Sequence, residues 1–149
     1  MNNIQPVIYK LKTASEQEIR SHLYSCNDNF SQPLSQRVKI EEYSKKIFDK
    51  AMTFEAWHDK MLVGLVAAYF NDLSSSASGF ITNVSVRPDF MGEGIATTLM
   101  NNCLEYAKEQ RIKNISLEVS LGDDAAVRFY KKFGFSETET RESTVLMHR

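Results

Sequence analysis

The sequence predicts an α/β fold with a mixed, mostly antiparallel central sheet that is flanked by helices and contains one β-α-β crossover. Three observations predict this fold. Extended apolar segments between residues 53 and 70 have the pattern of a hairpin. A strand, a glycine turn and a helical pattern then follow one another from residue 81 to 109. A further strand pattern at 114–119 completes a strand–helix–strand unit, which implies parallel pairing through a right-handed crossover.

The composition is that of one soluble globular domain, which we expect to cover residues 1–149. The net charge of −1 disfavours a nucleic-acid partner, because phosphate contacts require a basic surface. Neither a signal peptide nor a membrane span is recognisable, so we expect a cytoplasmic protein without a membrane partner. Cys26 and Cys103 are too few for a disulfide framework, and Cys103 lies at an apolar helical position typical of the core. We assign no metal ligands.

The first third of the chain predicts one strand and two helices. Pro6–Leu11 is a short β-rich run. Ser15 and Glu18 form a capping-box signature before a helix whose inner face carries Ile19, Leu23 and Cys26. The polar segment 27–36 is expected to be a loop, and the spacing of apolar residues predicts a second helix over 37–51.

A hairpin is expected next, with Thr53–His58 and Met61–Phe70 as its arms. Asp59 and Lys60 occupy the turn, although Asn-Gly or Asp-Gly is the favoured chemistry there, so the register is left open. The serine-rich segment Asp72–Ser78 is expected to be a mobile connection to the central strand.

The stretch from Ile81 to Ala96 organises the rest of the chain. An alternating strand over 81–86 ends before Pro88, because proline cannot donate to a sheet ladder. Gly92 and Gly94 follow, and a helical pattern begins at once. Unpaired N–H groups and the helix dipole make such a helix start a binding site for anions, so we expect the loop to hold a pyrophosphate.

The last third predicts a strand, a helix and a β-rich tail. After the strand at 114–119, Gly122 and Asp123 form a turn with good helix-capping residues. A helix over Ala125–Phe133 is expected to end at Gly134. The tail from Phe135 to His148 is expected to form two short strands, and it offers a way to pair across a homodimer.

Two other phosphate loops were compared with the glycine turn. A Walker loop requires G-x-x-x-x-G-K-[ST], which the sequence lacks. A Rossmann turn requires a third Gly or Ala where the chain has Thr97, and it should follow its strand directly. Five residues separate Val86 from Gly92, so a dinucleotide-binding turn of the Rossmann type is disfavoured.

The segments VSVRPDFMGEGIATTLM and ISLEVSLGDDAAVRFYKKFGF resemble the GCN5-related N-acetyltransferase (GNAT) superfamily, over residues 81–135. The resemblance implies a GNAT-like fold and acetyl transfer from acetyl-CoA to an amine. Its Q/R-x-x-G-x-G/A loop corresponds to Met91–Ala96, where Met91 departs from the pattern and Gly94 and Ala96 agree. It also implies that the backbone of Val84 and Val86 holds pantetheine and polarises the thioester carbonyl. The implied cofactor-binding residues are Val84, Ser85, Val86, Met91, Gly92, Glu93, Gly94, Ile95, Ala96, Thr97, Asp123, Ala126, Phe129 and Tyr130.

The second motif, A-x-x-F-Y-x-x-x-G-F, begins at Ala126. The resemblance implies that Tyr130 protonates the departing thiolate. A thiol pKa of about 8.5 and a phenol pKa of about 10 make that transfer reasonable. The plainer alternative is that Tyr130 only packs with Phe129 and Phe133. Asp123 stands where the family often has an Asn near the cofactor, and it is equally interpretable as a helix cap.

The general base is the open point of the sequence. Many members of the superfamily carry an acid in the central strand, where this chain has Thr82 and Asn83. Glu118 on the neighbouring strand is our candidate, acting directly or through water. The other titratable candidates are Glu55, His58, His22 and His148. For Glu118, Glu55 and His58 the plainer interpretation is a solvated strand residue, and His22 and His148 are weaker candidates still. An amine that arrives neutral, or that loses its proton through ordered water, would need none of them.

The early helices and loops are the expected acceptor site. We assign Phe30, Arg37, Glu55 and Asn83 to acceptor binding and expect a small-molecule amine. A non-catalytic acyl-CoA-binding module is the main alternative, motivated by the missing strand acid, Met91 and Asp123. A nucleotide-binding fragment of Rossmann type is the third hypothesis.

Overall fold

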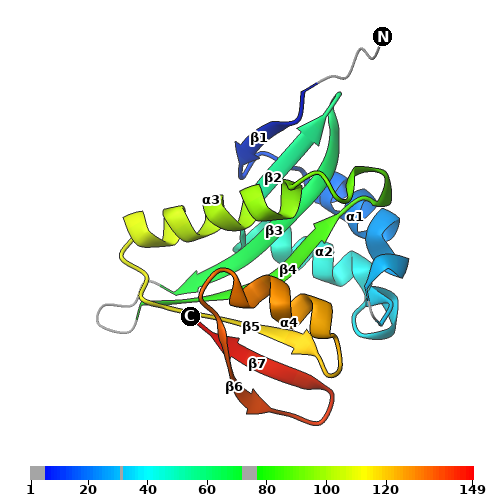
Figure 1. Ribbon diagram of the computed structural model, residues 1–149. Coiled ribbons are helices and arrows are strands. Elements are labelled where there is room, and N and C mark those ends of the chain that lie inside the picture. The colour runs from blue at the N-terminus through cyan, green and yellow to red at the C-terminus, as the bar shows by residue number, and fades with distance from the viewer. Residues whose placement is uncertain (1–5, 31, 72–76) are drawn as a thin grey trace.

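The computed structural model describes residues 6–30, 32–71 and 77–149 (Figure 1). These residues form a sheet of seven strands in the order β1-β2-β3-β4-β5-β7-β6. Neighbouring strands are antiparallel except for β4 and β5, which run parallel across the α3 crossover. The predicted α/β class, with its mixed sheet and one crossover, is therefore confirmed.

The strands are β1 (Ile8–Leu11), β2 (Met52–His58), β3 (Met61–Asn71), β4 (Ser78–Val86), β5 (Asn114–Ser120), β6 (Ser136–Thr140) and β7 (Thr144–His148). The helices are α1 (Glu16–Cys26), α2 (Ile40–Lys50), α3 (Ile95–Glu109) and α4 (Asp124–Lys131). Short 3₁₀ turns cover Asn27–Asn29, Leu34–Gln36 and Pro88–Phe90.

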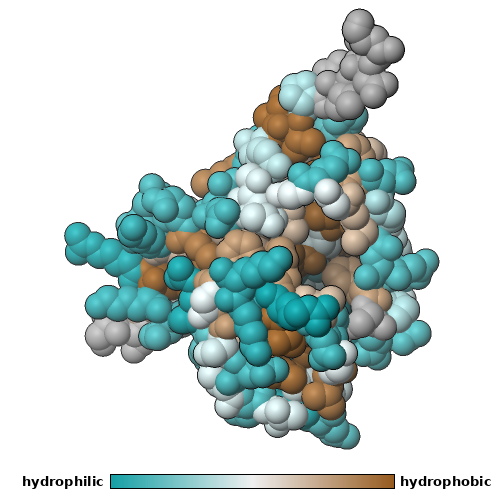
Figure 2. All heavy atoms as spheres, viewed as in Figure 1, coloured by the Kyte–Doolittle hydropathy of each residue, from teal (hydrophilic) through white to brown (hydrophobic). Residues whose placement is uncertain are grey.

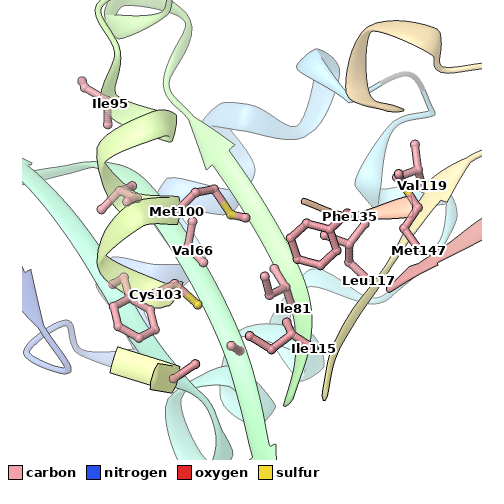
Figure 3. Close-up of a cluster of buried hydrophobic side chains, with 14 of the residues drawn as sticks. Val66, Ile81, Ile95, Met100, Cys103, Ile115, Leu117, Val119, Phe135 and Met147 are labelled. Atoms are coloured by element: carbon pink, nitrogen blue, oxygen red, sulfur yellow. The ribbon is translucent and has the colours of Figure 1, made fainter. Parts of the chain in front are cut away.

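Helices cover both faces of the sheet (Figure 1). On one face, the buried side chains of Met100 and Cys103 in α3 pack on the strands (Figure 3). Leu99 of α3 joins this core, and α4 adds partly buried apolar residues. On the other face, Ile19 and Leu23 of α1 and residues of α2 form a second core with the opposite side of β2 and β3. Two apolar layers against one sheet fix its position between the helices.

Gly64 permits the close approach of α3 to β3. A Cβ atom at this position would lie 2.7 Å from Cγ2 of Ile95 and 3.2 Å from Cβ of Ala56. The start of α3, and with it the glycine turn, is therefore seated directly on the sheet.

The local expectations agree well with the structure. The capping box of Ser15 and Glu18 is formed, Cys103 is fully buried, and Gly134 follows α4 with a φ of 91°. Asp59 and Lys60 both take positive φ, the backbone geometry of a type I′ hairpin turn. The expected mobile connection lies mostly outside the described residues.

Several elements differ in extent from the sequence prediction. β1 begins at Ile8 rather than Pro6, and β4 begins at Ser78 rather than Ile81. The segment expected to be a loop contains two 3₁₀ turns. The second helix begins at Ile40 rather than Arg37, because Lys39 is still extended. The helix predicted to reach Phe133 ends at Lys131, since the N–H groups of Lys132 and Phe133 form tighter, 3₁₀-type bonds to Phe129 and Tyr130.

Candidate active site

A cleft opens where β4 and β5 separate. Their parallel pairing runs only from Ser78 and Asn114 to Ile81 and Leu117, so the ends of the two strands diverge. The cleft has a volume of about 230 Å³. It is lined by Asn29, Phe30, Arg37, Ile81, Thr82, Asn83, Val84, Leu117, Glu118, Val119, Ser120, Asp123, Ala126 and Tyr130. Near the centre of the face in Figure 2, apolar atoms show between hydrophilic side chains, over the region of β4 and α4.

A β-bulge in β4 lies at the wall of this cleft. Ala67 pairs with Asn83 and Ala68 pairs with Ile81, which leaves Thr82 as the extra residue. The Tyr43 hydroxyl of α2 donates to the Thr82 carbonyl at 2.7 Å. A bulge bends its strand, and here the freed carbonyl is satisfied by a side chain from the helical layer.

Tyr130 reaches the cleft from the end of α4. Its ring packs edge-to-face against Phe129 and Phe135. Burial, and to a lesser extent the carboxylate of Asp123, raises the pKa of the Tyr130 hydroxyl. The phenol therefore remains protonated at any ordinary pH and can donate a proton or a hydrogen bond into the cleft.

Asp123 lies at the start of α4 and caps it. Its carboxylate accepts the backbone N–H of Ala126 at 3.1 Å. Asp123 is thus the helix cap that the sequence also allowed, while it lines the cleft beside Tyr130.

Glu118 projects from β5 into the same cleft. The Arg141 guanidinium donates to one carboxylate oxygen at 3.2 Å, and the Thr144 hydroxyl donates to the other at 2.7 Å. Arg141 also donates to Glu139 at 2.8 Å. Sequence reasoning missed Arg141 and Thr144, because only the pairing of β5 with β7 brings them next to Glu118.

The glycine turn precedes α3 at the far end of β4 (Figure 1). Gly92 and Gly94 have φ values of 82° and 80°, which favour glycine. The first hydrogen bond within α3 joins the Thr98 N–H to Gly94 O, so the N–H groups of residues 95–97 precede the helical ladder. Met91 is 58% exposed and takes no part in the core.

The connection between α1 and α2 forms the opposite wall. The guanidinium of Arg37 lies over the Phe30 ring, 5.8 Å from its centroid. Asn83 faces this wall from β4 and is buried. These three predicted acceptor-binding residues are therefore brought together in one cleft, on the side away from α4.

Residues 16–135 match the model of the acetyltransferase (GNAT) family. The chain belongs to this family. It is similar to an uncharacterized N-acetyltransferase of Methanocaldococcus jannaschii, with 36% identity over 80 residues that cover 52% of this chain and 35% of that protein. It is also similar to the putative ribosomal protein bS18 alanine N-acetyltransferase of Bacillus subtilis, with 33% identity over 63 residues that cover 42% of each. The matched segments thus span less than half the length of these two relatives.

Solved structures share the GNAT fold over nearly the whole chain. Arabidopsis thaliana Naa50, in complex with a bisubstrate analogue, has a TM-score of 0.76 and 21% identity, covering 95% of this chain and 97% of that one. The PaiA N-acetyltransferase of Thermoplasma acidophilum, in complex with coenzyme A, has a TM-score of 0.73 and 16% identity, covering 95% and 98%. The Rossmann hypothesis is wrong, because this sheet is mostly antiparallel and has one crossover.

Some residues assigned to cofactor binding in this GNAT chain lie elsewhere. Ser85 is buried and contacts His22 of α1 rather than the cleft. Ile95 is buried in the core beneath α3. Phe129 packs on Tyr130 and Phe133 and does not line the cleft. Each is therefore placed as a supporting residue, although their backbone atoms remain available to a ligand.

Glu55 is placed outside the cleft, at the centre of a buried network. Its carboxylate accepts the backbone N–H groups of Thr13 and Ala14, the hydroxyls of Thr13 and Thr53, and the indole N–H of Trp57. The side chain is fully buried. It holds the segment before α1 against β2, which accounts for a buried acid without a catalytic role.

The remaining histidine candidates are also away from the reaction cleft. His58 lies against the Phe90 ring at 5.0 Å. His148 contacts the Thr138 hydroxyl at 2.7 Å on the tail hairpin. His22 is buried beneath β4. Within the described residues no cluster of His, Cys, Asp or Glu is suited to hold a metal ion, and no helix there is long and apolar enough to cross a membrane.

Replacing Glu55 with Ala is expected to lower the free energy of unfolding by about 3 kcal/mol, because several buried donors lose a charged acceptor. Urea unfolding followed by tryptophan fluorescence measures the change. The control is Glu137→Ala, which removes an exposed carboxylate 3.7 Å from Lys131 and should cost at most about 1 kcal/mol. Equal stability of the two variants would contradict the structural role of Glu55.

Proposed function

We propose that this protein is an acetyl-CoA-dependent N-acetyltransferase that moves an acetyl group to a primary amine by direct attack. The observation that carries the proposal is the divergence of β4 and β5 beside Tyr130. Beyond Ile81, this edge of β4 pairs with no strand among the described residues, and it lies next to a protonated phenol and opposite a carboxylate. The complexes of similar folds with coenzyme A and with a CoA-peptide bisubstrate analogue support this choice of donor.

The glycine turn and the open strand would hold the donor. The N–H groups at the start of α3 suit the pyrophosphate, and the helix dipole favours its negative charge. The free edge of β4 near Val84 offers backbone groups to the pantetheine arm. One of its N–H groups would stabilise the oxyanion that forms as the amine attacks the thioester carbonyl.

Two side chains would then move the protons. Glu118 accepts a proton from the incoming ammonium, directly or through water, because each of its oxygens keeps a lone pair beside its present hydrogen bond. Tyr130 gives its proton to the departing sulfur, which would otherwise leave as a thiolate. Holding donor and acceptor in one cleft supplies much of the rate, so no covalent enzyme intermediate is required.

For the acceptor we revise the sequence-based expectation of a small-molecule amine. Relatives named as protein N-terminal acetyltransferases, and a bisubstrate analogue that contains the peptide MVNAL, favour the α-amine of a polypeptide. The cleft has an aromatic and a cationic side chain, Phe30 and Arg37, on the acceptor wall. A cytoplasmic location and a homodimer stay predictions from the sequence.

The first test is thiol release from acetyl-CoA with a panel of amines. We expect fastest release with peptides that bear a free α-amine, such as Met-Val-Asn-Ala-Leu or an alanine-started peptide, and slower release with spermidine, glucosamine and lysine. The same peptides with a blocked N-terminus are the control. Tight acetyl-CoA binding without release in the presence of any amine would instead favour the acyl-CoA-binding module.

Tyr130→Phe is expected to lower kcat by a factor of about 10² to 10⁴, the usual contribution of a general acid. Acetyl-CoA affinity, measured by calorimetry, should stay close to that of the wild type, because the ring is kept. Tyr106→Phe is the matched control, since it removes a phenol oxygen from the aromatic cluster of α3, outside the cleft. An unchanged kcat in the Tyr130 variant would remove this residue from the chemistry.

Glu118→Gln should reduce kcat/KM for the amine by about 10²-fold near neutral pH. The deficit should shrink above about pH 8, because a peptide α-amine, with a pKa of about 7.7 to 8.0, is then mostly neutral and needs no base. Glu139→Gln is the matched control, as Glu139 binds the same Arg141 without lining the cleft. A deficit of constant size across the pH range would argue for a binding role rather than a base.

A further inference from the structure

His22 is a fully buried histidine that the proposed reaction does not use. It lies on α1, directly beneath β4. Its Nδ1 atom is 3.1 Å from the carbonyl oxygen of Leu62, and its Nε2 atom is 2.9 Å from the hydroxyl oxygen of Ser85. Ser85 Oγ is in turn 2.7 Å from Oδ1 of Asn83, which lines the cleft. A chain of polar contacts therefore leads from the core to the candidate acceptor site.

The buried end of this chain has a fixed polarity. A carbonyl oxygen can only accept, and Leu62 O already takes the Nε–H of Arg87 at 2.7 Å. A bare Nδ1 lone pair facing Leu62 O would be repulsive, so Nδ1 must carry the proton. Burial lowers the pKa of His22 to about 4, with the nearby Arg87 charge as a smaller cause. The ring is thus neutral, and its Nε2 atom is an acceptor.

This polarity passes along the chain to Asn83. The neighbours of Nε2 are Ser85 Oγ at 2.9 Å and Cys26 Sγ at 3.6 Å. Because Nε2 accepts and the hydroxyl is the nearer and stronger donor, Ser85 donates its single proton to His22. Ser85 Oγ is then an acceptor towards Asn83. We therefore infer that the amide is turned over from the orientation that brings Oδ1 to Ser85, so that its NH₂ group faces Ser85 and its oxygen faces away. The two ends of an amide have nearly the same shape, and the hydrogen-bond partners decide its orientation.

The opposite orientation of the Asn83 amide would leave two unsatisfied acceptors facing each other in the core. There, the Ser85 hydroxyl would donate to the Asn83 oxygen, and two lone pairs would meet at His22 and Leu62, where no water can enter. When the amide NH₂ group faces Ser85, the unsatisfied acceptor is instead the amide oxygen, next to the cleft. The Tyr43 hydroxyl, which neighbours the Asn83 amide, gives its proton to Thr82 O. The oxygens of Tyr43 and Asn83 are then both acceptors, and a donor that enters the cleft can bind the Asn83 oxygen.

We propose that the amide oxygen of Asn83, oriented by His22 and Ser85, binds the N–H groups of the acceptor amine. This proposal rests on the proposed acetyltransferase activity and names the residue that receives the amine opposite Glu118. Asn83 and Glu118 line the same cleft from the two diverging strands. An ammonium fits this position because it has only donors to offer.

The polarity is tested by NMR without any substrate. Long-range ¹H–¹⁵N spectra of protein with ¹⁵N-labelled histidine distinguish the two neutral tautomers. The three histidine signals are assigned from His58→Gln and His148→Gln variants, because both residues are only half-buried. We expect His22 to be neutral and protonated on Nδ1 from about pH 8 to about pH 5. A proton on Nε2 would overturn the proposal.

The amine contact is tested by steady-state kinetics. The acceptor is Met-Val-Asn-Ala-Leu, or the amine that gives the fastest thiol release in the assay with the amine panel. Asn83→Leu keeps the side-chain size and should raise KM for the amine by about 10-fold, the effect of about one hydrogen bond, with KM for acetyl-CoA unchanged. Ser85→Ala should also raise KM for the amine, whereas Ser85→Thr, which keeps the hydroxyl, should have the KM of the wild type. Ser116→Ala on β5 is the control.

Separate results identify which idea fails. An unchanged amine KM in Asn83→Leu, with thermal stability near that of the wild type, would refute the contact even if the wild type is an active acetyltransferase. Asn83→Asp adds a spectroscopic check. A carboxylate can only accept, so Ser85 would donate its single proton to Asp, and His22 should then carry a proton on Nε2 to donate to Ser85. No thiol release from the wild type with any amine would refute the proposed function and, with it, the amine contact, while the tautomer would still report on the polarity of the network.

Discussion

The candidate site depends on the separation of β4 and β5 after Ile81 and Leu117. Parallel strands that stayed paired would use every backbone group in the ladder and would leave no space between them. The bulge at Thr82 bends β4 at this point, and the Tyr43 hydroxyl donates a hydrogen bond to the Thr82 carbonyl that the bulge leaves unpaired. The bulge lies directly after the last pair of β4 and β5, so the cleft and the open edge of β4 begin at the same point of the strand.

The two faces of the sheet support the two halves of the cleft. On one face, α3 lies close to β3 over Gly64, which places the glycine turn at the end of β4, and α4 brings Tyr130 to β5. On the other face, α1 and α2 bring polar groups beneath β4. In the proposed function, donor and acceptor would approach the same strand from opposite layers, an arrangement that suits direct transfer between them.

Much of the fold was predictable from local patterns, because the capping box, the glycine turn and the alternation in β4 are signals between neighbours in sequence. The polar contacts of the site were less accessible. Glu55 looked like an exposed strand residue, yet donors from Thr13 and Trp57 surround it. Arg141 reaches Glu118 only through the pairing of β5 with β7. Such contacts depend on strand order and register, which short-range patterns do not encode.

The departures from the family pattern are easier to interpret once the structure is known. Met91 is exposed, and the shape of the glycine turn comes from positive φ at Gly92 and Gly94 rather than from the side chain before them. A loop that binds through backbone N–H groups can therefore accept a methionine there. Asp123 already uses its carboxylate to cap α4, and its charge is a smaller cause, after burial, of the raised pKa of the Tyr130 phenol. An acid at this position is therefore a helix cap, and it makes the phenol a weaker acid rather than a stronger one.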